Sequence, residues 1–263
     1  MKYALLGEKL GHSFSPIIHK EIFKDLNIDA EYELKEIKKE EIKDTLDLLK
    51  KGIYNGYNVT IPYKKEVMQY LDEITPEAKK IGAVNTIAYK FGKLIGYNTD
   101  YYGFKEEVLF NKIDVENKEC YILGTGGASL ALHKALIDLG GNVLFVSRNP
   151  SNDITISYEE LKNKKPYLIV NATPIGMYPN VDSSPIEKDI INNTKYVMDI
   201  IFNPLQTKLL KYANSKMNGL FMLVGQAIKA EEIWQDRKYE LSIENLLKRI
   251  EMKLWTISED YFK

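Results

Sequence analysis

Apolar residues in the first hundred positions follow two spacings in turn, that of a strand and that of an amphipathic helix. Strand spacing occurs at 2–6, 31–37 and 54–61, and again at 84–89 and 93–97, which form a predicted hairpin around Phe91-Gly92. Helical spacing occurs at 15–26, 39–51, 62–71, 76–81 and 101–110. This alternation of strands and helices predicts an α/β domain.

A glycine turn between a strand and a helix lies near the middle of the chain. Cys120–Leu123 is a short apolar strand, Gly124–Ser129 is the turn, and Leu130–Leu139 has apolar residues at helical spacing. A second strand, Asn142–Val146, completes a βαβ unit, in which a dinucleotide pyrophosphate rests on the helix N-terminus. Ser129 stands where the third glycine of the G-x-G-x-x-G pattern is usual. The setting favours cofactor binding over a purely structural turn.

The rest of the chain continues the alternation. Strands are expected at 167–171 and 196–201, a Pro/Gly loop at 173–179, a short apolar run at 220–224, and helices at 206–217, from Gly225 to about Trp234 and at 241–255. The pattern predicts two α/β domains in series, one of residues 1–100 plus about 226–263 and one of residues 101–225. We expect the C-terminal helices to pack on the first domain, with hinges near Asp100 and Gly219.

Charge and composition favour a small-molecule partner. The 36 basic and 37 acidic residues nearly cancel, so the chain lacks the positive surface that nucleic acid or an anionic membrane attracts. No apolar run approaches membrane-spanning length. The single cysteine, Cys120, cannot form an internal disulfide and is expected as a buried thiol in the cytoplasm. His12, His19 and His133 are too scattered to suggest zinc, so no metal is expected.

Two serines precede the first predicted helix. Ser15 comes directly before Pro16, as a helix N-cap does. A cap leaves Ser13 without a role, and two hydroxyls beside a helix N-terminus could instead bind a carboxylate. Both readings stay open at this point.

Lys64 falls in the first turn of the helix predicted from Pro62. The macrodipole disfavours a cation there by roughly 0.3–1 kcal/mol, which would lower the pKa of Lys64 and suit an acid/base group. The alternative is an exposed lysine turn with no function.

Two further polar clusters, 82–86 and 96–100, end in Thr86 and Asp100. Asp100 or Thr99 could be no more than the N-cap of the helix at 101–110. Together with Lys64, however, these amides, hydroxyls and carboxylate suggest a site for a polyhydroxylated ligand. A Lys–Asp pair could there move a proton to or from an oxygen during hydride transfer.

These motifs, in this order, resemble those of the shikimate dehydrogenase family. The matching stretches are 11–16, 58–64, 82–86, 98–100, 124–129, 171–177, 199–204 and 222–227, which span nearly the whole chain. The resemblance implies a substrate domain and a Rossmann-type domain with a cleft between them. It also implies reversible reduction of 3-dehydroshikimate to shikimate by NADPH, on the route to chorismate and the aromatic amino acids.

The resemblance assigns roles to individual residues. It makes Lys64 and Asp100 the catalytic pair, with Lys64 the proton carrier. Ser13 and Ser15 would hold the ring carboxylate. The other substrate-binding residues would be Asn58, Thr60, Asn85, Thr99, Asp100, Phe202 and Gln226. The cofactor-binding residues would be Gly124, Thr125, Gly126, Gly127, Ala128, Ser147, Arg148, Asn149, Thr173, Ile200 and Gly219.

The end of the strand at 142–146 bears on cofactor choice. It lacks the acidic residue that binds a ribose 2′-hydroxyl, and Arg148 can pair with a 2′-phosphate, so NADP is favoured over NAD. Asp153, in the region where related enzymes often carry a second arginine, would weaken that selectivity.

Three residues depart from the family pattern. Phe202 replaces a common tyrosine, Tyr101 a usual glycine and Ser147 a common asparagine. An NAD-preferring quinate/shikimate dehydrogenase would share nearly every motif. A catalytically silent sensor of shikimate-type ligands is the alternative from another class, and the presence of both Lys64 and Asp100 argues against it. Monomer and homodimer are both compatible with the sequence.

Overall fold

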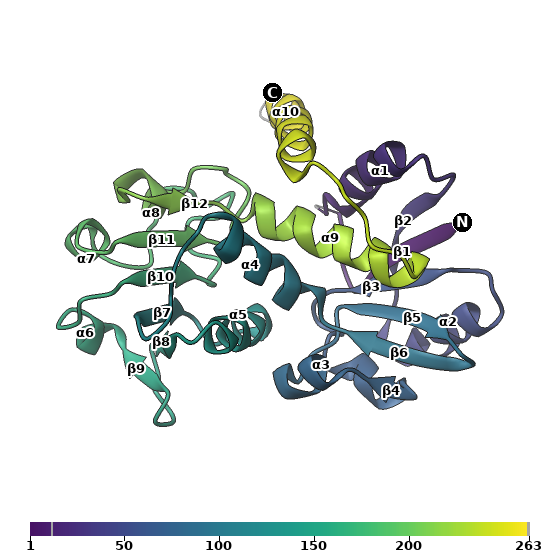
Figure 1. Ribbon diagram of the computed structural model, residues 1–263, viewed down its shortest axis with the longest axis horizontal. Coiled ribbons are helices and arrows are strands. Elements are labelled where there is room, and N and C mark those ends of the chain that lie inside the picture. Colours follow the sequence, from purple (N-terminus) through teal and green to yellow (C-terminus); the bar gives the residue numbers. More distant parts are fainter. Residues whose placement is uncertain (12, 262–263) are drawn as a thin grey trace. The chain divides into compact units, whose positions relative to one another are not determined.

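The computed structural model describes residues 1–11 and 13–261, with side chains through Leu254 in the last helix. It divides the chain into two compact units, which are described separately below. The first contains residues 1–99 together with the segment from 224 onward, and the second contains residues 100–223 (Figure 1). His12, which was considered above as a metal ligand, lies outside the described residues.

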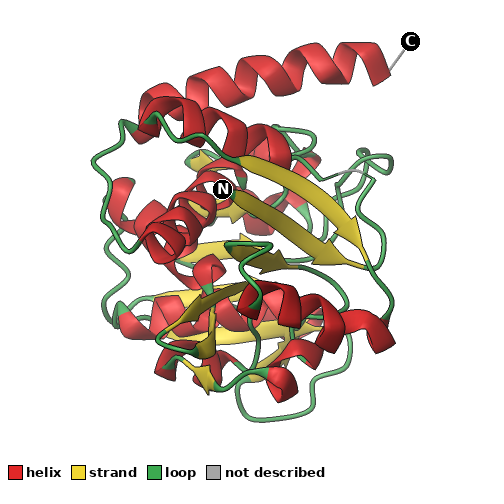
Figure 2. Ribbon diagram, turned by 90° about the vertical axis from the view of Figure 1, so that its right-hand side faces the viewer, coloured by secondary structure: helices red, strands yellow, loops and turns green. Residues whose placement is uncertain are grey.

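The first unit is built on a mixed sheet with strand order β2-β1-β3-β5-β6-β4. Its strands are β1 (Lys2–Gly7), β2 (Glu31–Glu36), β3 (Gly56–Val59), β4 (Glu73–Ile74), β5 (Thr86–Lys90) and β6 (Lys93–Tyr97). Its helical elements are α1 (Ser15–Leu26), η1 (Lys39–Glu41), α2 (Ile42–Lys50), η2 (Glu66–Tyr70) and α3 (Pro76–Ile81). The C-terminal segment adds most of α9 (Leu220–Gln235) and all of α10 (Ile243–Tyr261). In Figure 2, α10 is the long helix that leads to the C-terminus.

The two faces of this sheet differ in what covers them. Leu6 of β1 and Tyr57 of β3 share a buried cluster with Leu46 of α2. On the opposite face, the ring of Tyr3 stacks on that of Trp234 in α9, with centroids 4.6 Å apart. Because successive side chains in a strand point to opposite faces, Asn58, which follows Tyr57, belongs to the face covered by α1 and α9.

Close packing fixes α9 on the sheet. A Cβ atom at Gly56 would lie 2.2 Å from Nε1 of Trp234, so only glycine leaves room for the indole. The same Nε1 donates a hydrogen bond to the carbonyl oxygen of Ile87, 3.0 Å away. Helix α10 packs on α1, where Arg249 and Lys253 both pair with Glu21. Both C-terminal helices therefore belong to the first unit.

The second unit contains a sheet in which every adjacent pair of strands is parallel. The strand order is β12-β11-β10-β7-β8-β9. The strands are β7 (Glu119–Leu123), β8 (Asn142–Ser147), β9 (Thr155–Ser157), β10 (Leu168–Asn171), β11 (Tyr196–Asp199) and β12 (Lys216–Met217). The helices are α4 (Thr99–Phe110), whose first residue Thr99 belongs to the first unit, α5 (Gly127–Asp138), α6 (Tyr158–Leu161), α7 (Lys188–Asn192) and α8 (Lys208–Tyr212). The strand order reverses at β7, the place where Rossmann-type folds bind their ligands.

The predicted α/β class is confirmed, but three local predictions were wrong. No α-helix begins at Pro62, because the carbonyl oxygen of Lys64 accepts from the backbone nitrogen of Val84, 2.8 Å away, instead of from a residue one turn later. The helix expected at 206–217 is only α8, since Ala213 is extended and β12 follows. The apolar run at 220–224 is the helical start of α9, which continues through Gly225.

Two further observations concern sequence features noted above. Among the described residues, no helix is both long enough and apolar enough to cross a lipid bilayer. Cys120 is a free, fully buried thiol, and burial raises the pKa of this group to about 12. A thiol in that state is a poor nucleophile, so Cys120 has a packing role.

Candidate active site

The serine pair lies at the start of α1. The N-cap residue is Phe14 and makes no side-chain cap bond, so of the two readings left open above, Ser15 as an N-cap is wrong. Instead, Ser13 Oγ accepts from the backbone nitrogen of Ser15 at 3.3 Å and donates to Ser15 Oγ at 3.2 Å. Both side chains are half-buried. The structure thus brings together the two hydroxyls that were considered as a carboxylate site.

A buried network links β3, β5, α4 and α9. Asn58 and Thr86 are register partners on adjacent strands, and Asn58 Nδ2 donates to Thr86 Oγ1 at 2.9 Å. Asn85 Oδ1 accepts from the backbone nitrogen of Thr99 at 2.6 Å. Thr99 Oγ1 lies 3.1 Å from Thr86 Oγ1 and donates to Gln226 Oε1 at 3.3 Å. Four residues predicted from sequence therefore meet here, through Thr86, which was not predicted to bind substrate.

Tyr32 joins the serine pair to this network. Its hydroxyl donates to Asn58 Oδ1 at 2.7 Å, and the Ser15 side chain lies beside it and opposes the rise in the pKa of Tyr32 that burial causes. The ring of His19 stacks on that of Tyr32 at 3.9 Å between centroids, and His19 Nδ1 lies 2.6 Å from Glu231 Oε1. Sequence reasoning missed these residues. The sequence feature that could have indicated them is a polar residue, His19 or Glu231, among the apolar residues of a predicted helix.

Lys64 and Thr60 lie in the turn that follows β3, and both are half-buried. The backbone nitrogen of Thr60 donates to the carbonyl oxygen of Leu6 at 2.9 Å, which fixes the start of the turn. The helix whose dipole was expected to act on Lys64 is not formed, so that argument for its chemistry fails. Asp100 belongs to the second unit and lies half-buried in the first turn of α4.

The glycine turn follows β7 in the second unit. Gly124 has a φ of +96°, which favours glycine, and a Cβ there would lie 3.0 Å from Thr173 Cγ2. Helix α5 begins at Gly127, three residues before the predicted start, and Ser129 donates from Oγ to the carbonyl of Gly126. A Cβ at Gly126 or Gly127 would meet no atom within 4 Å. The helix N-terminus is therefore open to a phosphate, with Thr125 and Ala128 beside it.

The end of β8 carries the three residues expected at the adenosine ribose. The backbone nitrogen of Asn149 donates to Ser147 Oγ at 3.2 Å, which turns the chain. Arg148 is exposed. Burial raises the pKa of Tyr158, and the positive charge of Arg148 opposes that shift. Asp153 is exposed in the loop that follows.

The loop after β10 is held by a buried aspartate. Asn171 Oδ1 accepts from the nitrogen and hydroxyl of Thr173, at 3.0 and 2.7 Å. Asp199 accepts from Asn171 Nδ2 at 3.0 Å and from the Thr207 hydroxyl at 2.6 Å. Burial raises the pKa of Asp199 to about 6, against the lowering effect of its hydrogen bonds. Thr173 thus takes its position from a network rooted at the end of β11.

Ile200 and Gly219 are in direct backbone contact. A Cβ at Gly219 would lie 2.0 Å from the carbonyl oxygen of Ile200, and Gly219 N donates to the carbonyl of Ile201 at 3.1 Å. No side chain fits at Gly219 without a backbone shift. Phe202, half-buried, follows this contact in the chain.

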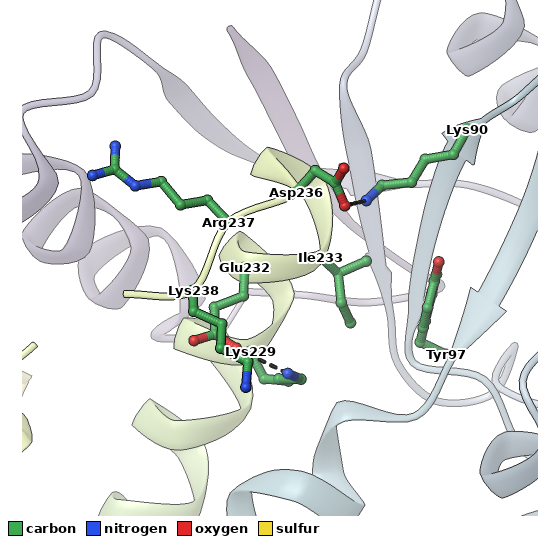
Figure 3. Close-up of a pocket in the computed structure, with 8 residues that line it drawn as sticks. All are labelled: Lys90, Tyr97, Lys229, Glu232, Ile233, Asp236, Arg237 and Lys238. Carbon is green, nitrogen blue, oxygen red and sulfur yellow. Dashed lines mark hydrogen bonds and ion pairs between the residues drawn. The ribbon is translucent and has the colours of Figure 1, made fainter. Parts of the chain in front are cut away.

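A pocket of about 320 Å³ lies elsewhere in the first unit. Figure 3 shows two ion pairs among its charged side chains, Lys90 with Asp236 and Lys229 with Glu232, each at 2.9 Å. None of the residues predicted to bind substrate or cofactor lines it. Within the described part of the chain, no group of three or more His, Cys, Asp or Glu residues could hold a metal ion.

Comparisons with known proteins agree with these observations. Residues 5–87 match the model of the shikimate dehydrogenase substrate binding domain. The chain is 46% identical to a shikimate dehydrogenase (NADP(+)) of Clostridium beijerinckii, over 99% of each chain.

Solved structures are also similar to this chain over nearly its whole length. A chorismate mutase/shikimate 5-dehydrogenase fusion protein from Clostridium acetobutylicum superposes with a TM-score of 0.92 at 42% identity, covering 96% of this chain and 97% of that chain. Shikimate 5-dehydrogenase from Thermus thermophilus, in complex with NADP(H) and shikimate, superposes with a TM-score of 0.84 at 29% identity, covering 95% and 99%.

Proposed function

This chain belongs to the shikimate dehydrogenase family, and on that premise we propose that it catalyses the reversible NADPH-linked reduction of 3-dehydroshikimate to shikimate. The observation that carries the proposal is the hydrogen-bonded network from Tyr32 to Gln226, with the hydrogen-bonded serine pair beside it. It gathers hydroxyl and amide groups in one place, as recognition of a polyhydroxylated carboxylate requires.

The substrate residues divide by the group that each would bind. Ser13 and Ser15 would donate from their hydroxyls to the ring carboxylate, beside the N-terminus of α1, where an anion is favoured. The ring hydroxyls would be bound by Thr60, Asn85, Asp100 and Gln226. Asn58, Thr99 and Phe202 would complete the lining of the site.

Proton transfer is assigned to Lys64 and Asp100. When bound, NADPH supplies the hydride that reduces the carbonyl carbon, and the carbonyl oxygen must then gain a proton. The Lys64 ammonium would donate that proton, and in the reverse direction the neutral amine would take it back. Asp100 would accept a hydrogen bond from the same hydroxyl and hold it against Lys64.

The second unit would hold the cofactor. The open space at Gly126 and Gly127 fits a pyrophosphate at the N-terminus of α5, with Gly124, Thr125 and Ala128 completing the turn. The adenosine ribose would meet Ser147, Arg148 and Asn149 at the end of β8. The nicotinamide half would lie near Thr173, Ile200 and Gly219.

Arg148 would set the preference for NADP. It is exposed at the end of β8, so its guanidinium can pair with a 2′-phosphate in two parallel hydrogen bonds. Asp153, exposed in the following loop, would reduce this preference through its negative charge.

We further infer a cytoplasmic enzyme, because the single cysteine is a buried thiol. Small shikimate-type molecules, rather than nucleic acid or a membrane, would be its partners. A monomer and a homodimer remain the two expected states in solution, and sedimentation of the purified protein distinguishes them.

The test of the proposed function is nicotinamide absorbance with purified protein, using shikimate and quinate, each with NADP and with NAD. Fastest turnover with shikimate and NADP is expected. Faster turnover of quinate with NAD would replace the proposal by the quinate alternative. Shikimate binding without turnover in any combination would identify a sensor.

A further inference from the structure

Tyr32 occupies a central place in the hydrogen-bonded network. Ser13 donates to Ser15, and the Ser15 side chain lies beside the Tyr32 hydroxyl. That hydroxyl donates to Asn58, which leads to Thr86 and the rest of the buried amide network. Tyr32 therefore connects the side chains proposed for the substrate carboxylate with those proposed for its ring hydroxyls.

The direction of these bonds follows from chemistry. A phenol has one proton, and at Tyr32 it is given to Asn58 Oδ1, so towards Ser15 the phenol oxygen can only accept. Burial, and then the negative charge of Glu231, raise the pKa of Tyr32 well above its ordinary value. The phenol therefore keeps its proton at neutral pH and holds both partners.

The ring of Tyr32 is itself held by a stacked histidine ring. His19 stacks on it with an interplanar angle of 9°. His19 and Glu231 have 0% exposed side chains, and His19 Nδ1 lies 2.6 Å from Glu231 Oε1. His19 Nε2 is buried with no hydrogen-bond partner among the described residues, which costs stability. A buried histidine with an unsatisfied nitrogen is a poor choice for stability alone, and its ring contact with Tyr32 gives it another role.

We propose that Tyr32, oriented by the buried His19–Glu231 pair, is a positioning residue that fixes the side chains of Ser15 and Asn58 for substrate binding. The inference rests on the proposed function, because it takes the serine pair as the carboxylate site. Without the Tyr32 hydroxyl, Ser15 and Asn58 can turn to other rotamers, and substrate binding must then restrain them. Hydride and proton transfer in the bound complex do not involve this hydroxyl.

The test is Tyr32→Phe in the full-length enzyme, because phenylalanine keeps the ring stack and removes only the hydroxyl. We expect KM for shikimate to rise about five- to tenfold, the effect of one lost hydrogen bond. The values of kcat and of KM for NADP should stay within about twofold, because the lost bond acts on substrate binding alone. Tyr57→Phe is the matched control, since Tyr57 is a buried tyrosine of the same unit whose hydroxyl has no partner in the described structure. It should leave all three constants unchanged.

A second comparison separates positioning from direct contact with substrate. In a Ser15→Ala background, Tyr32→Phe should raise KM for shikimate by a clearly smaller factor, because one of the groups it positions is already gone. An unchanged KM for shikimate in Tyr32→Phe, or an equal rise in Tyr57→Phe, would overturn the inference. It would also be overturned if the rise in KM of the double variant equalled the product of the rises in the two single variants. Wild-type turnover is measured first, so failure of the proposed function itself is recognised separately.

Discussion

The side-chain amide of Asn171 donates a hydrogen bond to the buried carboxylate of Asp199, 3.0 Å away. This bond joins the last residues of β10 and β11, and Asn171 in turn holds Thr173. A buried carboxyl group therefore supports one of the residues proposed to bind cofactor. Its ionisation has a consequence for stability.

Asp199 should make stability fall as pH rises. Its pKa is about 6 in the folded state and near 3.8 when unfolded, so between these values the folded state binds more protons. The full loss is on the order of 3 kcal/mol, of which about 2 kcal/mol falls between pH 4 and pH 6. Asp199→Asn removes this titration. The thermal unfolding midpoint of the variant, relative to that of the wild type, should therefore rise as pH is raised from about 4 to 6.

Asp138→Asn is the control for that comparison. Burial alone would raise the pKa of Asp138, but hydrogen bonds from Lys134 and Tyr101 outweigh it and lower the pKa. Its stabilisation is lost only as pH falls below about 4, so no similar trend should occur from about pH 4.5 to 6. Parallel curves for wild type and Asp199→Asn would contradict the assignment.

Lys64→Ala should lower turnover by about two to four orders of magnitude, because a general acid/base is lost. Shikimate binding should be largely kept, since other side chains would hold the carboxylate and hydroxyls. Steady-state kinetics and calorimetric titration with shikimate measure the two effects. Lys65→Ala, at the exposed neighbouring lysine, is the control and should have nearly wild-type turnover. Near-normal turnover in Lys64→Ala would remove this residue from the mechanism.

Arg148→Ala should weaken NADP far more than NAD. Loss of charged hydrogen bonds to the 2′-phosphate should raise KM for NADP by about ten- to a hundredfold, with KM for NAD changing less than about twofold. The measurement is the ratio of kcat/KM for the two cofactors. Arg237→Ala, which removes an exposed arginine of the first unit, should leave the ratio unchanged. Equal losses with both cofactors would refute phosphate pairing.

Gly126→Ala tests the glycine turn without disturbing the fold. The added methyl group meets no protein atom within 4 Å, and the φ of −74° suits alanine, so the thermal midpoint should not fall. If a pyrophosphate binds there, KM for NADP should rise about tenfold or more, because the backbone can no longer approach it. Unchanged affinity for NADP would place the pyrophosphate elsewhere.

Gly219→Ala is the contrasting variant. Its methyl group would overlap the backbone of Ile200, so the protein must shift even without cofactor. We expect a loss of about 1–3 kcal/mol in stability, seen as a lower thermal midpoint of the apo protein. A variant as stable as wild type would contradict the close contact.

Periodicity and turn residues predicted much of the fold, and family motifs predicted the function. The βαβ unit at 118–149 was predictable because Gly124 and Gly126 mark the turn between an apolar strand and a helix, and a second apolar strand follows. The irregular turn around Lys64 was not, because a backbone bond from Val84, twenty residues later, replaces the local helical one. Tyr32 and Thr86 were missed for a similar reason, since their partners come from other strands and helices.

The first unit is assembled from two separate stretches of the chain, whereas the second is continuous. During synthesis, residues 100–223 are complete before Gln226, Glu231 and Trp234 leave the ribosome. The second unit can therefore fold while the first still lacks the helix that covers Tyr3 and Gly56. Thr99 and His19 must wait for their partners on α9 until translation is nearly finished. Nascent chains that stop early would thus carry a finished dinucleotide-type fold beside an unfinished sheet, a form that chaperones and proteases can distinguish from the complete protein.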